Sequence, residues 1–305
     1  MSKILCTGGA GFIGSHLVDR LVSLKHDVVV LDNLSTGKAD NINPSATTII
    51  RDINQDLHGV FAAHSFDYVF HLAAFINLRN SVRDPYQCAQ DNVMGSLNLI
   101  LHCLKNKVKK FIFSSTGGAI YSEKEPLPWN EDTVVGPASP YGWSKMAIEQ
   151  YLQIASQLYG LNYSTLRYSN VYGLRQNAEG EAGVISIFLD KISKGETLSI
   201  FGSGDQTRDF VHVDDVVNAN LAVMPLTHCD TYNVSTNIAT SVNELLETLQ
   251  QLVSCSTTVR RAPAIPGEIL HTQLDYKKLS LATGWRPQHL SLKSGLEQLV
   301  KEMKL

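Results

Sequence analysis

The sequence has few of the features that mark disulfide frameworks, metal centres or nucleic-acid surfaces. Its five cysteines are scattered and include no CxxC pair, which is typical of reduced thiols in a cytosolic protein. Its ten histidines include no HxxxH or HExxH pair, so we expect no metal site. The net charge is −3 and no polybasic run is present, which gives no sign of a nucleic-acid partner or a membrane-surface partner.

Long hydrophobic runs are missing as well. No apolar stretch reaches the length that crosses a bilayer. The opening "MSKILCTGG" has only a few apolar residues before its glycines, which favours a first strand over a signal peptide. The chain can nevertheless bury a core, because 44% of its 305 residues are hydrophobic and only 18% are charged. This length and composition suit one large domain or two modest ones.

Short apolar runs alternate with helical patterns over the first half of the chain. The strand-like runs lie at 4–6, 28–31, 68–70, 111–113 and 163–166. The helical patterns between them cover 12–25, 83–105 and 139–159. This alternation predicts an α/β fold, a Rossmann-type doubly wound parallel sheet with helices on both faces.

The regular alternation weakens after residue 173. Further helical patterns lie near 183–194, 214–223, 241–253 and 290–303. We therefore expect a first domain at 1–173 and a second, smaller α/β domain at 174–305. Some segments of the second domain are expected to pack back on the first.

The segment "TGGAGFIG", residues 7–14, follows the first strand and opens a helix. Gly8 permits a tight turn, Gly11 lets the backbone approach a pyrophosphate, and Gly14 allows close helix–strand packing. The next strand ends at Asp32, where a carboxylate can bind both hydroxyls of the adenosine ribose. The same carboxylate repels the 2′-phosphate of NADP. The first domain is thus predicted to bind NAD.

The segment "SPYGWSKMAIEQ" places Tyr141 and Lys145 one helical turn apart, on one face. A surface tyrosine beside a solvated lysine would give the same spacing in the sequence. Downstream of a dinucleotide loop, however, the pair indicates catalysis. The lysine ammonium and oxidised nicotinamide both favour phenolate, so we expect a lowered pKa of Tyr141 and a role as general base.

With these motifs in place, the chain resembles the extended short-chain dehydrogenase/reductase family. It is most similar to the nucleotide-sugar epimerases of the UDP-glucose 4-epimerase type. The resemblance covers essentially the whole sequence. It is carried by "TGGAGFIGSHLV", "LDNLSTG", "HLAA", "DNVMGSLNL", "SSTGGAIY", "YGWSK", "LRYSNVYG" and "GSGDQTRDFVHVDD".

The resemblance implies a set of binding residues. Those implied to contact NAD are Gly8, Gly11, Phe12, Ile13, Gly14, Asp32, Asn33, Ser35, Thr36, Gly37, Asp52, Ile53, Leu72, Ala73, Ala74, Asn92, Ser114, Tyr141, Lys145 and Tyr168. Those implied to bind a nucleotide sugar are Thr116, Asn170, Val184, Ser199, Phe201, Arg208, Glu268 and Thr272. Thr116, Tyr141 and Lys145 match the family's catalytic group.

No carboxylate stands between Thr116 and Tyr121 in "SSTGGAIY". The family's dehydratases and decarboxylases place acids in this loop for elimination or carbanion chemistry. A C4 epimerase needs neither, because Thr116 can bond the C4 oxygen while Tyr141 moves the proton. We expect Gly117 and Gly118 to leave room in which the sugar turns over, although the two glycines could merely form a turn.

The chain also departs from the family's pattern. Ile265 and Leu270 stand where such epimerases often carry arginines near the diphosphate, and Phe75 and Ser169 are unusual at their positions. Substrate identity is therefore less well specified than cofactor and reaction type. Thr272 falls where the family's gatekeeper beside the sugar C2 substituent lies. A small residue there predicts that an N-acetyl sugar is accepted, unless Thr272 is an ordinary strand residue.

The family pairs the helices near 83–105 and 139–159 across a two-fold axis, so we expect a homodimer. Apolar residues that suit such buried faces, or the sheet alone, are Leu97, Ile100, Leu101 and Leu104. Three other functions stay open: net oxidoreduction or dehydration of a nucleotide sugar, epimerisation at another carbon, and a regulatory module that binds NAD without catalysis. The intact Thr116, Tyr141 and Lys145 argue against the last.

Overall fold

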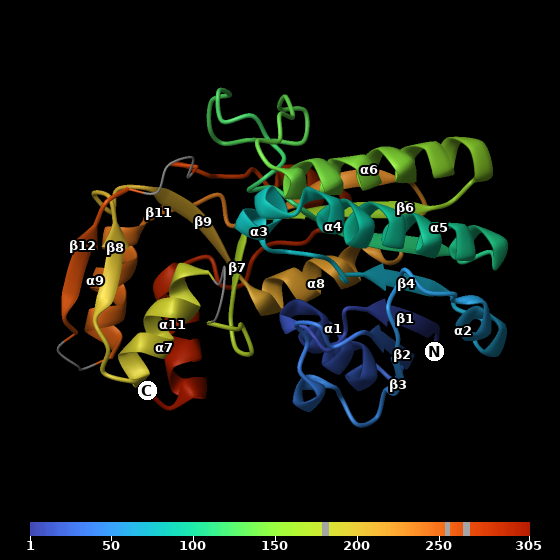
Figure 1. The fold of residues 1–305 in the computed structure, drawn as a ribbon, viewed down its shortest axis with the longest axis horizontal. Coiled ribbons are helices and arrows are strands. Elements are labelled where there is room, and N and C mark those ends of the chain that lie inside the picture. Colours follow the sequence, from blue (N-terminus) through green and yellow to red (C-terminus); the bar gives the residue numbers. More distant parts are fainter. Residues whose placement is uncertain (179–182, 254–256, 265–268) are drawn as a thin grey trace.

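The computed structural model describes residues 1–178, 183–253, 257–264 and 269–305. Its centre is a seven-stranded sheet in the order β10-β6-β5-β4-β1-β2-β3, in which every neighbouring pair is parallel (Figure 1). The strands are β1 (Lys3–Thr7), β2 (Asp27–Asp32), β3 (Thr47–Ile50), β4 (Tyr68–His71), β5 (Lys110–Thr116), β6 (Tyr163–Tyr168) and β10 (Asp230–Val234). This confirms the predicted Rossmann-type sheet and adds two edge strands, β3 and β10.

Helices cover both faces of this sheet. One face carries α1 (Phe12–Ser23), α8 (Val213–Val223) and α10 (Lys277–Thr283). The other carries α2 (His58–Ala63), α5 (Gly95–Lys105) and α6 (Pro140–Tyr159). Ile4 packs in the first core while Leu5, its neighbour on β1, packs in the second. Because both faces are covered, the strands read as continuous apolar runs without polar alternation.

A second, smaller lobe lies beside the carboxyl ends of the strands (Figure 1). Its core joins α7 (Val184–Ser193), α9 (Val242–Leu252) and α11 (Leu292–Met303) to a parallel strand pair, β8 (Leu198–Phe201) and β12 (Val259–Ala262). A three-stranded sheet of β7 (Asn170–Tyr172), β9 (Thr207–His212) and β11 (Ala239–Ser241) borders it. Segments α8, β10 and α10 return from the second half of the chain to the large sheet.

The pattern over 83–105 forms three pieces instead of one helix. Asp84 caps α4 (Pro85–Ala89), whose first residue is a proline, and α3 (Leu78–Arg83) precedes it. A π-helical turn, Gln90–Met94, then interrupts the ladder before α5 begins. Such turns are rare and often lie at functional sites. Asn92 of this turn is buried in the protein interior, where its side-chain amide forms the hydrogen bonds described below.

The sequence predicts reduced thiols and no membrane-spanning segment, and the structure describes both features. Cys6, Cys88, Cys103 and Cys229 are free thiols, and Cys255 lies outside the described residues. Among the helices that the structure describes, none combines the length and the apolar character needed to cross a membrane.

Candidate active site

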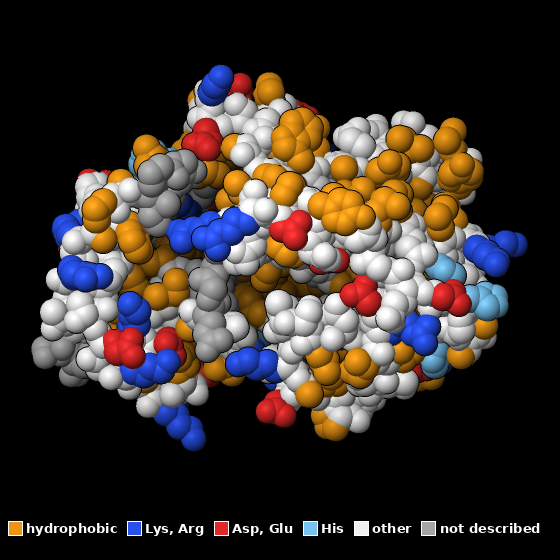
Figure 2. All heavy atoms as spheres, viewed as in Figure 1, with side chains coloured by type: hydrophobic (Ala, Val, Ile, Leu, Met, Phe, Trp, Pro, Cys, Tyr) orange, Lys and Arg blue, Asp and Glu red, His pale blue; other side chains and the backbone are white. Residues whose placement is uncertain are grey.

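A cavity of about 690 Å³ opens at the carboxyl ends of the central strands. Its wall is built by the loops that follow β1, β2, β3 and β4, by the end of β5 and by the start of α6, and Arg175 and Gly183 approach from the side of the second lobe. The molecular surface is hollowed between the two lobes on this side (Figure 2). Ligands bind at this edge of open α/β sheets, where neighbouring crossovers diverge to opposite faces.

The glycine loop is built for close approach. Gly8 has a φ of +72°, and a Cβ there would lie 2.6 Å from the backbone nitrogen of Ala73. A Cβ on Gly14 would lie 2.1 Å from the Gly8 carbonyl oxygen, so this glycine brings α1 against the loop. Gly11 is the N-cap of α1 and supplies no capping side chain. The first turn of α1 therefore presents backbone N–H groups and a positive dipole to the cavity, which suits a pyrophosphate.

Asp32 lies at the end of β2 with both carboxylate oxygens fixed. Oδ2 accepts a hydrogen bond from the Ala10 N–H at 2.9 Å, and Oδ1 accepts one from the Leu34 N–H at 2.8 Å. Each oxygen keeps a second lone pair and the side chain lines the cavity. This arrangement fits a ligand with two neighbouring hydroxyls, as on a ribose.

The far end of the cavity is polar. Asn33 donates to the Asp52 carboxylate at 2.7 Å, and Asn33 Oδ1 accepts from the Ser35 N–H at 3.0 Å. Burial raises the pKa of Asp52, but hydrogen bonds from Asn54 and Asn33 outweigh it and hold that pKa below its ordinary value. Ile53 supplies an apolar wall beside these groups. An ionised carboxylate next to an apolar wall suits an aromatic base with exocyclic donors.

All but one of the predicted NAD residues reach the wall of this cavity, and Asn92 is the exception. Asn92 is buried and contacts a residue of the cavity wall instead of lining the cavity itself. Its Oδ1 accepts from the Phe75 N–H at 2.7 Å, and its Nδ2 donates to the Phe75 carbonyl at 3.0 Å. It thereby fixes the loop after β4, which does line the cavity. The binding roles of all these residues stay predictions.

The predicted catalytic residues meet where β5 ends and α6 begins. Ser139 caps α6 and Pro140 is its first residue, which places Tyr141 in the first turn, facing the cavity. The Thr116 side chain lies next to the Tyr141 hydroxyl, and its interaction lowers the pKa of Tyr141. Lys145, one turn further along α6, is buried and donates to the Ser114 carbonyl at 2.8 Å.

Burial dominates the electrostatics of this group. Burial, with a smaller contribution from Cys88, raises the pKa of Tyr141 to about 12, and the bond from Thr116 offsets only part of this. Burial lowers the pKa of Lys145 to about 8, against Cys88 and Glu149, which raise it. The protein alone thus does not lower the pKa of Tyr141. The expected lowering invokes oxidised nicotinamide together with Lys145, so it stays a prediction.

A buried ion pair, which the sequence analysis missed, supports the catalytic strand. Glu149 and Arg167 are joined at 2.6 Å, and the Ser115 hydroxyl donates to Glu149 at 2.6 Å. Arg167 also donates to the Tyr121 hydroxyl at 2.9 Å, which donates in turn to Asn233. An arginine inside the apolar strand "YSTLRY" was the available signal, because a buried charge requires a partner.

The two glycines after Thr116 have different surroundings. A Cβ on Gly117 would lie 2.2 Å from Leu274 Cδ1, whereas a Cβ on Gly118 would meet nothing within 4 Å. Neither glycine lines the cavity described above. The expectation that both leave room for a turning sugar is therefore wrong for Gly117, whose missing side chain makes room for Leu274.

The predicted substrate residues lie in the second lobe and around its edge. Asn170 on β7 pairs with Phe210 on β9, and Arg208 on β9 donates to the carbonyls of Thr207 and Leu270. Thr272 is buried, and its hydroxyl has no hydrogen-bond partner among the residues that the structure describes.

None of the described substrate residues reaches the cavity wall, so their binding roles stay predictions. Val184 begins α7 and Phe201 ends β8. Ser199 lies in a separate shallow hollow with Arg260. Glu268 and Ile265 fall outside the described residues.

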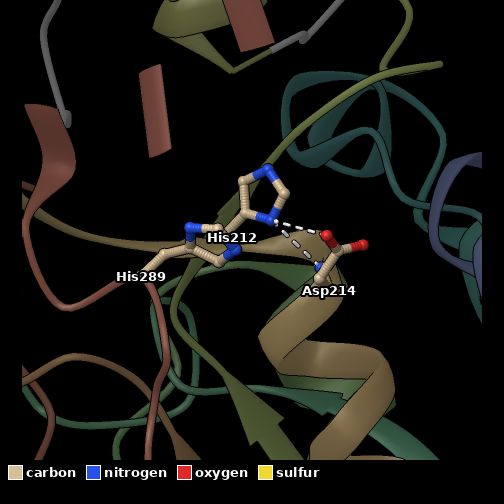
Figure 3. A group of neighbouring side chains, drawn as sticks. All are labelled: His212, Asp214 and His289. Atoms are coloured by element: carbon tan, nitrogen blue, oxygen red, sulfur yellow. Dashed lines mark hydrogen bonds and ion pairs between the residues drawn. The ribbon is translucent and has the colours of Figure 1, made fainter. Parts of the chain in front are cut away.

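One further cluster joins residues that are distant in sequence. His212, Asp214 and His289 each bring one donor atom within 4.8 Å of the others (Figure 3), a grouping that could hold a metal ion and that a search for closely spaced histidines misses. His212 Nδ1 accepts from the Asp214 N–H at 3.3 Å and so caps α8, and its ring lies 4.2 Å from that of His289. The cap already uses the lone pair of Nδ1.

The comparisons with known proteins agree with this geometry. The sequence profile of the NAD dependent epimerase/dehydratase family matches residues 4–235. A putative UDP-glucose 4-epimerase of Methanocaldococcus jannaschii is 44% identical over 99% of this chain and 98% of its own length. The solved structure of a Thermotoga maritima UDP-glucose 4-epimerase with UDP-glucose superposes with a TM-score of 0.97 at 43% identity, covering 99% of this chain and 98% of that one. A UDP-N-acetylglucosamine 4-epimerase from Methanobrevibacter ruminantium, in complex with UDP-N-acetylmuramic acid, reaches a TM-score of 0.94 at 35% identity, covering 99% and 98%.

Proposed function

The chain belongs to the NAD-dependent epimerase/dehydratase family, and on that basis we propose that it inverts C4 of a UDP-linked hexose. The observation that carries the proposal is the placement of Tyr141 next to Thr116 and one helical turn from Lys145, with Tyr141 and Lys145 lining a cavity suited to a dinucleotide. The reaction oxidises C4 to a ketone, lets the 4-keto sugar present its other face and reduces it again.

The cofactor in this proposal is NAD. The glycine loop and the first turn of α1 hold its pyrophosphate, and Asp32 accepts hydrogen bonds from its adenosine ribose. Bound there, NAD supplies the redox chemistry at C4 and is restored within each cycle. Asp32 excludes a 2′-phosphate by charge, and its own two hydrogen bonds hold the carboxylate in place.

The chain's own residues manage the proton and the oxygen. Tyr141 takes the proton from the C4 hydroxyl and returns it, acting as general base and then general acid. Thr116 orients the C4 oxygen toward Tyr141, since its side chain lies next to the Tyr141 hydroxyl. Lys145 stays fixed by Ser114 and holds the nicotinamide ribose. A cationic neighbour in addition to Lys145 is needed to bring the Tyr141 pKa down from about 12, and oxidised nicotinamide provides that charge.

The chemistry stops at epimerisation because the loop after Thr116 carries no acid. No Asp or Glu lies between Thr116 and Tyr121, and Glu149, whose carboxylate lies behind β5, is occupied by Arg167 and Ser115. Elimination of water from the 4-keto sugar requires a group that removes the C5 proton and another that protonates the leaving hydroxyl. The residues at the end of β5 offer hydroxyls only.

The substrate is a UDP-sugar, and the N-acetylated pair is included in the proposal. Two relatives align over nearly the whole chain. One is named a UDP-glucose 4-epimerase and the other a UDP-N-acetylglucosamine 4-epimerase. Thr272 is small, and within the described part of the chain its hydroxyl has no hydrogen-bond partner. These two observations support acceptance of a C2 N-acetyl group.

The assembly in this proposal is a cytoplasmic homodimer formed through α5 and α6. Ile100 faces the sheet and is buried, whereas Leu101, the next residue on α5, is 63% exposed. Trp143, Ile154 and Leu158 on α6 are also exposed. Apolar side chains gather over these two helices on one face of the molecule (Figure 2). An exposed apolar face of this kind marks an interface.

The experiment that tests the function is a screen of nucleotide sugars without added cofactor. Purified protein is incubated with UDP-, GDP-, CDP- and dTDP-linked hexoses and with the UDP-N-acetylhexosamines, and products are followed by NMR. The proposal expects C4 epimers from the UDP-sugars. A 4-keto-6-deoxy product would contradict the proposal in favour of dehydration, and inversion at another carbon would contradict it in favour of a different epimerase.

A further inference from the structure

A chain of buried hydrogen bonds links the glycine loop to the catalytic helix through His71. Thr7, His71, Ser96 and Asn92 are all at most 2% exposed. His71 Nδ1 lies 2.7 Å from the Thr7 hydroxyl, and His71 Nε2 lies 2.7 Å from the Ser96 hydroxyl. These residues come from β1, β4, α5 and the π-helical turn. Within this set of side chains, His71 connects Thr7 to Ser96 and Asn92.

The direction of each hydrogen bond follows from its neighbours. The Ser96 hydroxyl lies against the Asn92 carbonyl, which can only accept, so Ser96 must donate there. Its oxygen is then the acceptor for His71, which requires a proton on Nε2. The other nitrogen, Nδ1, is left to accept from the Thr7 hydroxyl. The Thr7 oxygen in turn accepts from the Ala73 N–H at 3.3 Å. One tautomer of neutral His71 therefore satisfies every member of the chain.

The surroundings of His71 favour the neutral form. The rings of Phe111 and Phe113 pack against the imidazole, with centroids 5.6 and 5.7 Å away. The charged group that acts on it is Lys145. Burial and then Lys145 lower the pKa of His71 to about 3, so the ring is uncharged at neutral pH.

The other end of the chain reaches the catalytic tyrosine. The Asn92 side chain donates to the Ser144 hydroxyl at 2.8 Å, and Ser144 donates to the Tyr141 carbonyl at 2.7 Å. The same Asn92 holds Phe75 in the cavity wall. The start of α6 is thus connected through His71 to the strand that carries the glycine loop. The loop after β4 is held by Asn92 and also by the bond from the Ala73 N–H to Thr7.

We propose that His71 is a positioning residue that, as the neutral Nε2–H tautomer, sets the distance between the dinucleotide loop and Tyr141. The proposal rests on the function proposed above, in which Tyr141 must meet a substrate atom next to the cofactor. Thr7 fixes one side of the imidazole at the end of β1. Ser96 and Asn92 carry the other side to α6. Small displacements in such an arrangement cost catalysis more than binding, because reaction requires closer alignment than affinity does.

The variants that test this separate the two sides of the ring. His71→Phe keeps the aromatic packing and removes both hydrogen bonds. His71→Gln keeps a donor toward Ser96, and His71→Asn keeps an acceptor toward Thr7. Phe111→Leu is the matched control, since it loosens the packing around His71 and removes no hydrogen bond. We expect kcat to fall roughly 10- to 100-fold in His71→Phe with KM little changed. His71→Gln should recover more activity than His71→Asn, and Phe111→Leu should retain it.

Two further readouts do not depend on turnover. Nitrogen-15 NMR of the wild-type protein should show that His71 is protonated on Nε2 and unprotonated on Nδ1. A tyrosine titration, taken as the difference from Tyr141→Phe, should show the pKa of Tyr141 displaced in His71→Phe and unchanged in Phe111→Leu. If no nucleotide sugar is turned over, the proposed function fails while these two results still decide the role of His71. An Nδ1–H or doubly protonated ring, or an unmoved Tyr141 together with full kcat in His71→Phe, would overturn the proposal.

Discussion

The side chains of Thr116 and Tyr141 lie next to each other, with Thr116 at the last residue of β5 and Tyr141 in the first turn of α6. This contact joins the two elements that carry these hydroxyls, and in the proposed reaction it would place a donor and a base on the same reacting oxygen. Lys145 does not enter the contact, because its ammonium is held by the Ser114 carbonyl. The arrangement suits proton transfer at an alcohol.

Replacing Tyr141 with Phe removes the base and leaves the ring. Loss of a general base typically costs about 10²- to 10⁴-fold in rate, so kcat should fall by that order. NAD should remain bound, because the glycine loop and Asp32 are untouched. Turnover and the cofactor content of purified protein measure the two effects. Thr116→Val should lower kcat less, since it removes the orienting hydroxyl and keeps the base. Unchanged kcat in Tyr141→Phe would assign the proton transfer elsewhere.

Replacing Asp32 with Ala should weaken NAD binding by about 10- to 100-fold, as hydrogen bonds to charged groups contribute about 1.5–3 kcal/mol. The variant also leaves the N–H groups of Ala10 and Leu34 without their acceptor. Asp40→Ala is the matched control, because Asp40 is exposed and does not line the cavity. Calorimetric titration with NAD and NADP gives both affinities. A wild-type preference for NADP would contradict the assignment of Asp32.

Gly117→Ala should destabilise the protein, and Gly118→Ala should not. The new Cβ at Gly117 would overlap Leu274, and overpacking of this kind costs about 1–3 kcal/mol. The Cβ at Gly118 would enter open space, so its effect should stay within about 0.5 kcal/mol. Urea unfolding measures both. Combining Gly117→Ala with Leu274→Ala should recover part of the loss if the overlap is the cause, and equal effects of the two glycine variants would refute the packing argument.

The first half of the site could be predicted because local sequence determines it. Gly8, Gly11 and Gly14 act within one loop and Asp32 ends the following strand, so their arrangement needs only the strand–helix–strand order. Gly117 was misread because the residue that demands it, Leu274, comes from a distant part of the chain and leaves no local signal.

The π-helical turn and the strand β10 were missed for the same kind of reason. The turn at Gln90–Met94 is stabilised by contacts of Asn92 with Phe75 and Ser144. Strand β10, "DTYNV", is polar at its start and becomes a strand by pairing with β6. The role of His71 was invisible because its partners Thr7 and Ser96 lie 64 and 25 residues away. Tertiary contacts decide such features, and local propensity does not.

The free energy of unfolding should fall as the pH is lowered from neutrality toward 4. His71 and His212 have folded pKa values of about 3 and about 4, below their ordinary value of 6.5. Between those values the unfolded chain binds protons that the native state does not, so stability is fully present above pH 6.5 and is lost as the pH falls toward 4. Asp209, whose pKa burial raises to about 6, acts in the opposite direction between pH 3.8 and 6.

Urea unfolding at pH 7, 6 and 5 isolates the contribution of His71. In His71→Phe the free energy of unfolding should depend less steeply on pH than in the wild type. An identical slope in His71→Phe would mean that His71 titrates normally in the folded protein, which would also contradict its place in the buried chain.

The most direct test of the proposed reaction follows the hydrogen at C4. UDP-glucose carrying deuterium at C4 is incubated with the purified protein, without added NAD, and the product is examined by NMR and mass spectrometry. If the same hydrogen leaves C4 and returns to the opposite face of the sugar, the UDP-galactose formed keeps its deuterium at C4 and none appears in the solvent. Loss of the label to water, or accumulation of a 4-keto-6-deoxy sugar, would contradict epimerisation at C4.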